Sequence, residues 1–250
     1  MSSTVWQLHG WQAHLQVGSF AGQVNLLAPH QGLSLTLGPE NGVVVLDILG
    51  IELPSPAPGP ENPPADSYVR GDDLVVVFAQ AGPRPVRVEA YWRAGHSPAA
   101  MLSVELQVSV QTSLLESVPE LVADSALPGA EVWQLRDPRA GVFERLSQPH
   151  GEAIRLQPEQ GAGCLLFRLP GSSLSYAEMI HPSDFREDQL ATAAADSDLT
   201  LRHRLFSGEL EKGVILRGRV LGLLLPREND QQAAAQAFAA FSESPPPLTT

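Results

Sequence analysis

The run Leu102-Ser103-Val104-Glu105-Leu106-Gln107-Val108-Ser109-Val110-Gln111 places an apolar residue at every second position and a polar residue between each pair. Side chains of a β-strand alternate between two faces, so this run predicts a strand with one face on a core and the other in water. A helix would scatter the same apolar residues around its axis. Strands that are half solvated in this way are typical of antiparallel sheets.

The same alternation returns in three other stretches, at residues 86–93, 13–17 and 33–37. Two apolar runs, 43–46 and 74–78, predict strands that are covered on both faces. Many strands separated by glycine and proline favour a sandwich of two sheets. We therefore expect an all-β fold, a large antiparallel β-sandwich.

Helical patterns are few. The stretch from Asn229 to Ser242 is rich in alanine and glutamine and carries one apolar face, which predicts a C-terminal α-helix. A shorter helix is expected to start after Ser183 or Asp184 and to run through Ala195.

The predicted domain organisation is simple. One β-sandwich domain is expected over residues 1–227, with a helix over 228–243 packed on it and a tail over 244–250. Six prolines crowd residues 54–64, and because proline cannot donate a hydrogen bond to a sheet, this segment is expected to be a surface loop between strands.

The charge and the cysteine content narrow the classes of function. The chain has 28 acidic and 16 basic residues, a net charge of −12, which disfavours binding to nucleic acid and to anionic membranes. Cys164 is the single cysteine and lies in an apolar run, so we expect a small buried side chain and no cysteine metal cluster.

Sequence signatures of cofactor sites and of membrane segments are absent. No phosphate-binding glycine loop, nucleophile elbow or zinc-protease helix occurs, so no cofactor and no metal are expected. No apolar run is long enough to span a bilayer and no leader pattern precedes residue 15, so a cytoplasmic, bacterial protein is expected.

The segment 176–185 gathers the most suggestive side chains. Tyr176, Glu178 and His181 lie where a strand gives way to a loop, and a glutamate with a histidine can perform general acid–base chemistry. However, residues three apart on a strand point to opposite faces, so Glu178 and His181 would diverge. The alternative is that Glu178 makes a buried ion pair while residues 182–184 start a helix.

Two further groups could contribute to a site. His203 alternates in step with the leucines of its strand and so faces the core. It could belong to a site, or it could be a hydrogen-bonded core histidine. Arg217 and Arg219 share one face within residues 209–219 and could hold an anion through paired hydrogen bonds. Pairing with acidic side chains across the sheet, including Glu178, is the alternative.

Several stretches resemble a family of uncharacterised bacterial proteins, which implies no activity. They are Tyr68–Gly71, Arg84–Arg93, Glu178–Pro182 and Leu210–Ile215. In size and β content the chain is also similar to the galactose-mutarotase-like sandwiches. That resemblance implies a histidine acid and a glutamate base on one concave sheet, but it is one of architecture and transfers no motif to this sequence.

Two hypotheses of function follow. The first is a β-sandwich binding or assembly module without catalytic activity, which would expose an apolar patch and form an oligomer. The alternative is a carbohydrate-related, mutarotase-like sandwich that binds or isomerises a sugar, with Glu178, His181 and His203 as acid–base residues. In either case a sugar or an anionic small molecule is the expected ligand, with these side chains as its contacts: Tyr176, Arg217 and Arg219.

The alternative carries a geometric expectation. The segments 176–185 and 209–219 should converge with His203 on one open cleft, within hydrogen-bonding reach of one another.

Overall fold

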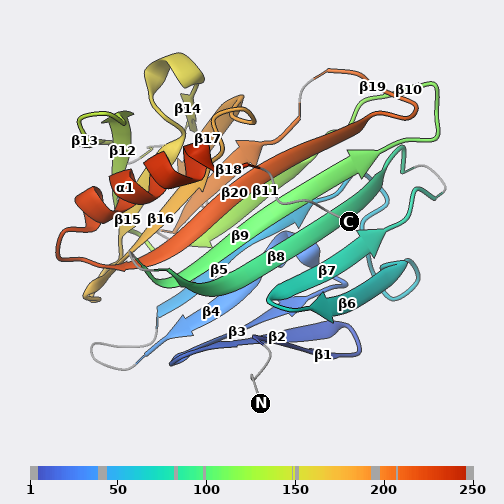
Figure 1. The fold of residues 1–250 in the computed structure, drawn as a ribbon, viewed down its shortest axis with the longest axis horizontal. Helices are drawn as coiled ribbons and strands as arrows, with labels where there is room; N and C mark the ends of the chain where they lie inside the picture. Colours follow the sequence, from blue (N-terminus) through green and yellow to red (C-terminus); the bar gives the residue numbers. More distant parts are fainter. Residues whose placement is uncertain are drawn as a thin grey trace.

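The computed structural model describes residues 5–38, 44–81, 84–97, 100–147, 149, 152–192, 198–206 and 208–245. These residues form two nine-stranded antiparallel sheets, a two-stranded ribbon, two short 3₁₀ turns and one α-helix. The two sheets lie face to face, and the helix lies on the outside of one of them (Figure 1). The predicted antiparallel β-sandwich with a C-terminal helix is confirmed.

The first sheet, called sheet 1, begins at the N-terminal strands. Its order is β1 (Trp6–His9), β2 (Gln12–Val17), β3 (Phe20–Asn25), β4 (Leu33–Leu37), β5 (Val44–Glu52), β11 (Val122–Leu127), β18 (Leu199–Arg204), β17 (Glu187–Thr192) and β14 (Ile154–Leu156).

The second sheet, called sheet 2, contains the longest strands. Its order is β13 (Val142–Arg145), β12 (Glu131–Asp137), β15 (Cys164–Arg168), β16 (Leu174–Ile180), β20 (Ile215–Pro226), β9 (Ala100–Gln111), β8 (Arg87–Ser97), β7 (Asp73–Phe78) and β6 (Asp66–Arg70). The ribbon pairs β10 (Glu116–Ser117) with β19 (Leu210–Glu211).

Two sequence-based expectations are wrong. The helix expected after Ser183 is instead a single turn at 182–184 followed by strand β17, which pairs with β18; residues 193–195 lie outside the described residues. Asp188 and Leu190 alternate inward along β17, and burial against the neighbouring strand outweighs local helix propensity. The run 43–46 is not covered on both faces, since Val45 is exposed, and Val43 lies outside the described residues.

Helix α1 (Asp230–Glu243) divides the outer face of sheet 2 into two halves. It packs over β15, β16 and β20, where it covers a small apolar cluster that includes Cys164, Met179 and Leu225. Cys164 is fully buried there, as predicted. The other half of this face, on β6 to β9, stays outside the helix (Figure 1).

The helix is fixed at both ends. At its start, Arg168 donates two hydrogen bonds to Asp230, at 2.9 and 3.0 Å, and Ser175 donates a third at 2.8 Å. At its end, Arg219 donates to the carbonyl and the hydroxyl of Ser244, both at 3.0 Å. No helix among the described residues has the length and the apolar character needed to cross a bilayer.

The hydrogen bonds that Arg168 and Ser175 donate to Asp230 predict that removing this carboxylate destabilises the fold. Burial alone would raise the pKa of Asp230, but the hydrogen bonds from Arg168 and Ser175 hold it below its ordinary value. Asp230→Ala should lower the free energy of unfolding by about 2–3 kcal/mol, because charged hydrogen bonds are lost and Arg168 keeps no partner there. Urea denaturation measures this, with the exposed Glu243→Ala as the control; an equal effect of both changes would contradict this role of Asp230.

Candidate functional site

A hydrogen-bonded chain of polar side chains crosses the space between the two sheets. Glu178 projects from β16 of sheet 2, whereas His203 and Asp188 face each other on β18 and β17 of sheet 1. The Nε2 atom of His203 lies 2.9 Å from Oε1 of Glu178, and its Nδ1 atom lies 2.6 Å from Oδ1 of Asp188. One imidazole therefore bridges two carboxylates that belong to opposite sheets.

The other oxygen of Glu178 is also bonded. Ser125, from β11, donates to Oε2 at 2.7 Å, and the hydroxyl of Tyr176 donates to the same atom. Gly222 lies opposite Glu178 on β20, where a Cβ atom would stand 2.5 Å from the Tyr176 hydroxyl oxygen. A glycine at this position is therefore required for Tyr176 to reach Glu178.

The backbone of β5 supports Ser125. Leu49 adopts the left-handed conformation, with φ of 56°, opposite a shift of register in the pairing of β5 with β11. Its amide donates to Oγ of Ser125 at 2.9 Å, and its carbonyl accepts a hydrogen bond from the indole of Trp92 at 3.0 Å. A non-glycine residue is strained there, so the surrounding contacts must impose this conformation.

The electrostatics of the network follow from burial and from the paired charges. Burial alone would lower the pKa of His203, but Asp188 and Glu178 raise it to about 10. Burial raises the pKa of Asp188, and it raises the pKa of the Tyr176 hydroxyl, which stays a donor. At neutral pH His203 is therefore a cation enclosed by carboxylates.

The network is sealed from solvent. Glu178 and His203 have no exposed surface and Asp188 has 1%. Three hollows on the described surface are all lined by other side chains. Acid–base chemistry by Glu178 and His203 on a substrate, which stays a prediction, would require the two sheets to part.

The remaining predicted residues lie elsewhere. His181 points away from Glu178, as its spacing implied: its Nδ1 atom lies 2.8 Å from Oγ of Ser183 and its ring meets the Phe241 ring edge-on at 5.3 Å. Arg219 lies on the outer face of sheet 2 and pairs with Glu105 at 2.7 Å. The segments 176–185 and 209–219 therefore do not converge with His203 on one open cleft.

Sequence reasoning missed two members of the network, Asp188 and Ser125. Asp188 was assigned to a helix, which hid its alternation with Leu190 along β17. Ser125 alternates with the buried residues Ala123 and Leu127, so it occupied a core-facing phase in the sequence. Because buried polar groups are normally hydrogen-bonded, a serine at a core-facing position predicts a buried hydrogen-bond partner.

An open depression of about 220 Å³ lies on the half of sheet 2 that helix α1 leaves uncovered. Strands β6, β8, β9 and β20 contribute to it, because their alternating polar residues all face outward here. Neighbouring rows of the sheet supply Glu89–Ser109–Arg217 and Arg87–Gln111–Ile215. The lining side chains are Tyr68, Arg70, Arg87, Glu89, Tyr91, Ser109, Gln111, Ile215 and Arg217.

The depression is locally basic. It combines Arg70, Arg87 and Arg217 with the carboxylate of Glu89, and Asp73 lies 3.9 Å from Arg70, whereas the whole chain carries a net charge of −12. Arg87 lies 2.8 Å from Glu89, and the hydroxyl of Tyr91 donates to the same carboxylate. Burial and the neighbouring Glu89 raise the pKa of Tyr91, so its hydroxyl remains protonated.

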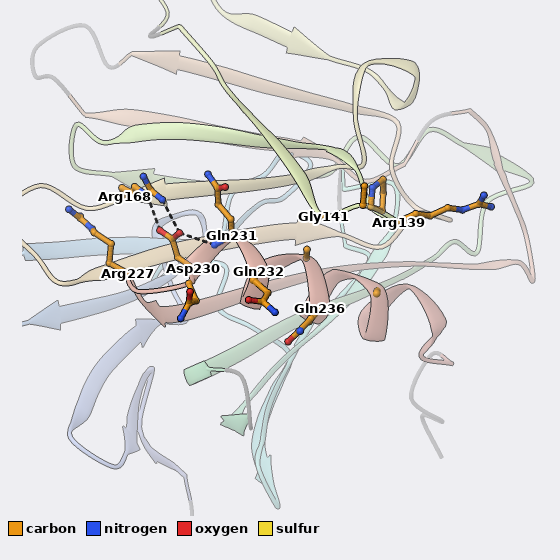
Figure 2. A pocket seen from close by; sticks show the side chains of 13 residues that line it. Arg139, Gly141, Arg168, Arg227, Asp230, Gln231, Gln232 and Gln236 are labelled. Carbon is orange, nitrogen blue, oxygen red and sulfur yellow. Dashed lines mark hydrogen bonds and ion pairs between the residues drawn. The ribbon is translucent and has the colours of Figure 1, made fainter.

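A larger hollow, of about 720 Å³, lies between the 138–141 turn and helix α1. Figure 2 shows Arg168 bonded to Asp230 at one end, with Gln232 and Gln236 along the helix and Arg139 beyond them. Arg168 also stacks on the ring of Trp133 at 5.1 Å. Arg139, Arg168 and Arg227 line this groove, and Arg168 is paired with Asp230. No aromatic side chain of the described residues lines it, so this groove is the weaker candidate for a sugar ring.

The outer face of sheet 1 carries a third hollow, of about 340 Å³, with acidic and basic side chains in balance: Glu120, Glu187, Arg202 and Arg204. Among the described residues, no cluster of three or more histidine, cysteine, aspartate or glutamate side chains is arranged to hold a metal ion.

The buried network predicts that stability depends on pH. Because the pKa of His203 is raised to about 10 in the folded state, its contribution is complete below about pH 6.5, the unfolded value, and is lost as the pH rises through 10. Urea denaturation between pH 6.5 and 10 should show this loss in the wild type and a flatter profile in His203→Gln. The exposed His14→Gln should keep the wild-type profile; a wild-type profile in His203→Gln would contradict the assignment.

No protein-family model matches the chain, and no curated protein sequence matches it. Solved structures do. The Slr1438 protein of Synechocystis aligns with a TM-score of 0.56 at 11% identity, over 90% of this chain and 98% of that one. A galactose mutarotase-like protein of Lactobacillus casei aligns with a TM-score of 0.56 at 12% identity, over 85% and 99%.

A candidate aldose 1-epimerase of Klebsiella pneumoniae aligns with a TM-score of 0.58 at 8% identity, over 94% of this chain and 86% of that one. At such identities the likeness concerns the fold alone. The chain therefore has the fold of the galactose-mutarotase-like β-sandwiches, as its architecture suggested.

Proposed function

We propose that this protein is a binding module without catalytic activity, which takes a sugar-like, negatively charged small molecule into the depression on sheet 2. One observation carries the proposal: outward-facing side chains of four strands form a basic, polar depression, while the candidate acid–base pair is sealed between the sheets. The proposed ligand therefore binds the outer face of sheet 2, and the buried residues Glu178 and His203 stabilise the fold.

The chemistry of the depression suits such a ligand. Arginine guanidinium groups match the geometry of carboxylates and phosphates through paired hydrogen bonds. Glu89, Ser109 and Gln111 offer acceptors and donors for hydroxyl groups, and the rings of Tyr68 and Tyr91 offer an apolar surface with a polar end. At about 220 Å³, the volume lies below the roughly 300–1,000 Å³ of sites for drug-sized ligands and suits a single sugar ring.

A polar row of the sheet borders the depression. Gln107 lies between Tyr91 and Arg219 in the register of the sheet. It is 3% exposed, and neither atom of its amide has a hydrogen-bond partner among the described residues. Buried polar atoms normally find a partner, so an ordered water enclosed beside the depression would satisfy them.

The proposed absence of catalysis follows from where the acid–base residues lie. Sugar isomerisation needs an acid and a base within hydrogen-bonding reach of the substrate. Glu178 and His203 meet each other and not the surface, and His181 is turned towards Phe241.

Ligand binding tests the proposal directly. Glucuronate or glucose 6-phosphate should raise the melting temperature and bind in calorimetry, whereas glucose should bind more weakly, since only the first two offer an anion to the arginines. Arg217→Gln should weaken anion binding by about 10- to 100-fold, the loss of one charged hydrogen-bonded pair. The matched control is Arg155→Gln, an exposed arginine on sheet 1; no binding by any of the sugars, or an equal loss in the control, would refute the proposal.

Polarimetry tests the absence of catalysis. The protein should not accelerate the mutarotation of glucose or galactose beyond the buffer rate, because the candidate acid–base pair, Glu178 and His203, does not reach the surface. Acceleration by the wild type that Glu178→Gln and His203→Gln abolish, while circular dichroism shows both variants folded, would establish the sugar-isomerising alternative.

A further inference from the structure

An arm projects from the sandwich where β9 and β20 leave the body. We define the arm as residues 112–120 and 208–215, which include the ribbon of β10 and β19. Figure 1 shows the ribbon extending past the ends of β9 and β20. The amide of Lys212 donates to the carbonyl of Leu115 at 3.2 Å, so the pairing continues beyond the ribbon itself.

The arm is the most apolar part of the described surface. Five of the ten exposed large hydrophobic residues belong to it: Leu114, Leu115, Val118, Val214 and Ile215. Leu115 is 83% exposed, whereas Leu210 on the partner strand is fully buried and anchors the arm. A cluster of exposed apolar side chains on a surface marks a contact site.

The tip of the arm is acidic. Glu116 lies directly opposite Glu211 in the ribbon, and like charges in that position repel each other. Glu209 is also exposed on the arm, against the single basic residue Lys212, whereas Glu120 lies beside Arg202 and Arg204 at sheet 1. A cationic partner at the tip would relieve this repulsion.

The base of the arm is basic, because the arm joins the sandwich at the depression on sheet 2. Ile215 belongs to both the arm and the depression, and in the register of the sheet it lies beside Gln111 and, one strand further, Arg87. From its outer end to the sandwich, the arm therefore carries an acidic tip and an apolar middle, and it joins a basic base at the depression.

We propose that the arm binds the arm of a second copy of this chain. In a two-fold dimer with the arms antiparallel, each acidic tip meets the basic base of the partner, and the apolar middles pack against each other. From residue 111 to residue 116 an extended chain spans roughly 17 Å, enough to bring a tip to the opposite base. A basic or an acidic foreign partner would complement one end of the arm only, so charge complementarity favours a second copy.

This inference does not rest on the proposed ligand. The dimer uses the rim of the depression at Arg87 and Arg217, and its formation is measured without any sugar present. Since an anionic sugar and the partner's tip would compete for these arginines, sugar binding is measured at protein concentrations below those at which the dimer forms. A failed dimer test therefore leaves the ligand proposal standing, and a failed binding test leaves the dimer proposal standing.

A charge swap between two variants tests the proposal. Multi-angle light scattering should give the wild type twice the 26.8 kDa mass of one chain. Glu116→Arg with Glu211→Arg makes tip and base both basic, and Arg87→Glu with Arg217→Glu makes both acidic. Each variant alone should dimerise at least about tenfold more weakly, and an equimolar mixture should recover the dimer, since both contacts of the mixed pair are then attractive.

The controls separate the interface from folding and from net charge. Glu228→Arg with Glu243→Arg changes the charge by the same amount at exposed positions away from the arm and should leave dimerisation unchanged. Leu115→Ser should weaken the dimer without lowering the melting temperature of the monomer. A wild type that stays monomeric at its highest soluble concentration, or folded variants whose mixture stays monomeric, would overturn the proposal.

Discussion

The contact on which the structure depends is the buried imidazolium of His203 between Glu178 and Asp188. It joins side chains of opposite sheets at distances of 2.9 and 2.6 Å in the middle of an apolar core. Apolar side chains could slide past one another, but a buried charge tolerates only the geometry that pairs it. The network therefore fixes how the two sheets sit on each other, and so where each outer face presents its polar side chains.

The two faces of sheet 2 differ in their surroundings. Residues of one parity along β9 and β20 fill the core, while those of the other parity form the outer face. Helix α1 covers one half of that face with apolar contacts, and polar side chains occupy the other half. The depression lies on this uncovered half, on paired strands whose backbone hydrogen bonds hold the spacing of its side chains.

The sequence was sufficient to predict the sandwich, because strict alternation, as in 102–111, requires strands with an apolar face on the core and a polar face in water. It also predicted that Glu178 and His181 would diverge, from their spacing alone. It could not show that His203 meets Glu178, since the two are linked only through the packing of separate sheets, nor that Asp188 joins them. Arg217 and Arg219 share a face, as expected. Arg219 is bonded to Glu105 and to Ser244, which follows helix α1, whereas Arg217 lies beyond the helix and lines the depression. The sequence alone did not show where the helix would end on this face.

The position of β20 has a consequence for how the chain folds. This strand pairs with β16 on one side and β9 on the other, although it follows both by a long stretch of chain. Without β20, sheet 2 would consist of two separate halves, with unpaired amides and carbonyls along one edge of β16 and one edge of β9. Pairings between such distant segments form slowly, and open strand edges can pair with other molecules in the meantime. The interval before β20 closes the sheet is therefore when this protein is most vulnerable to aggregation.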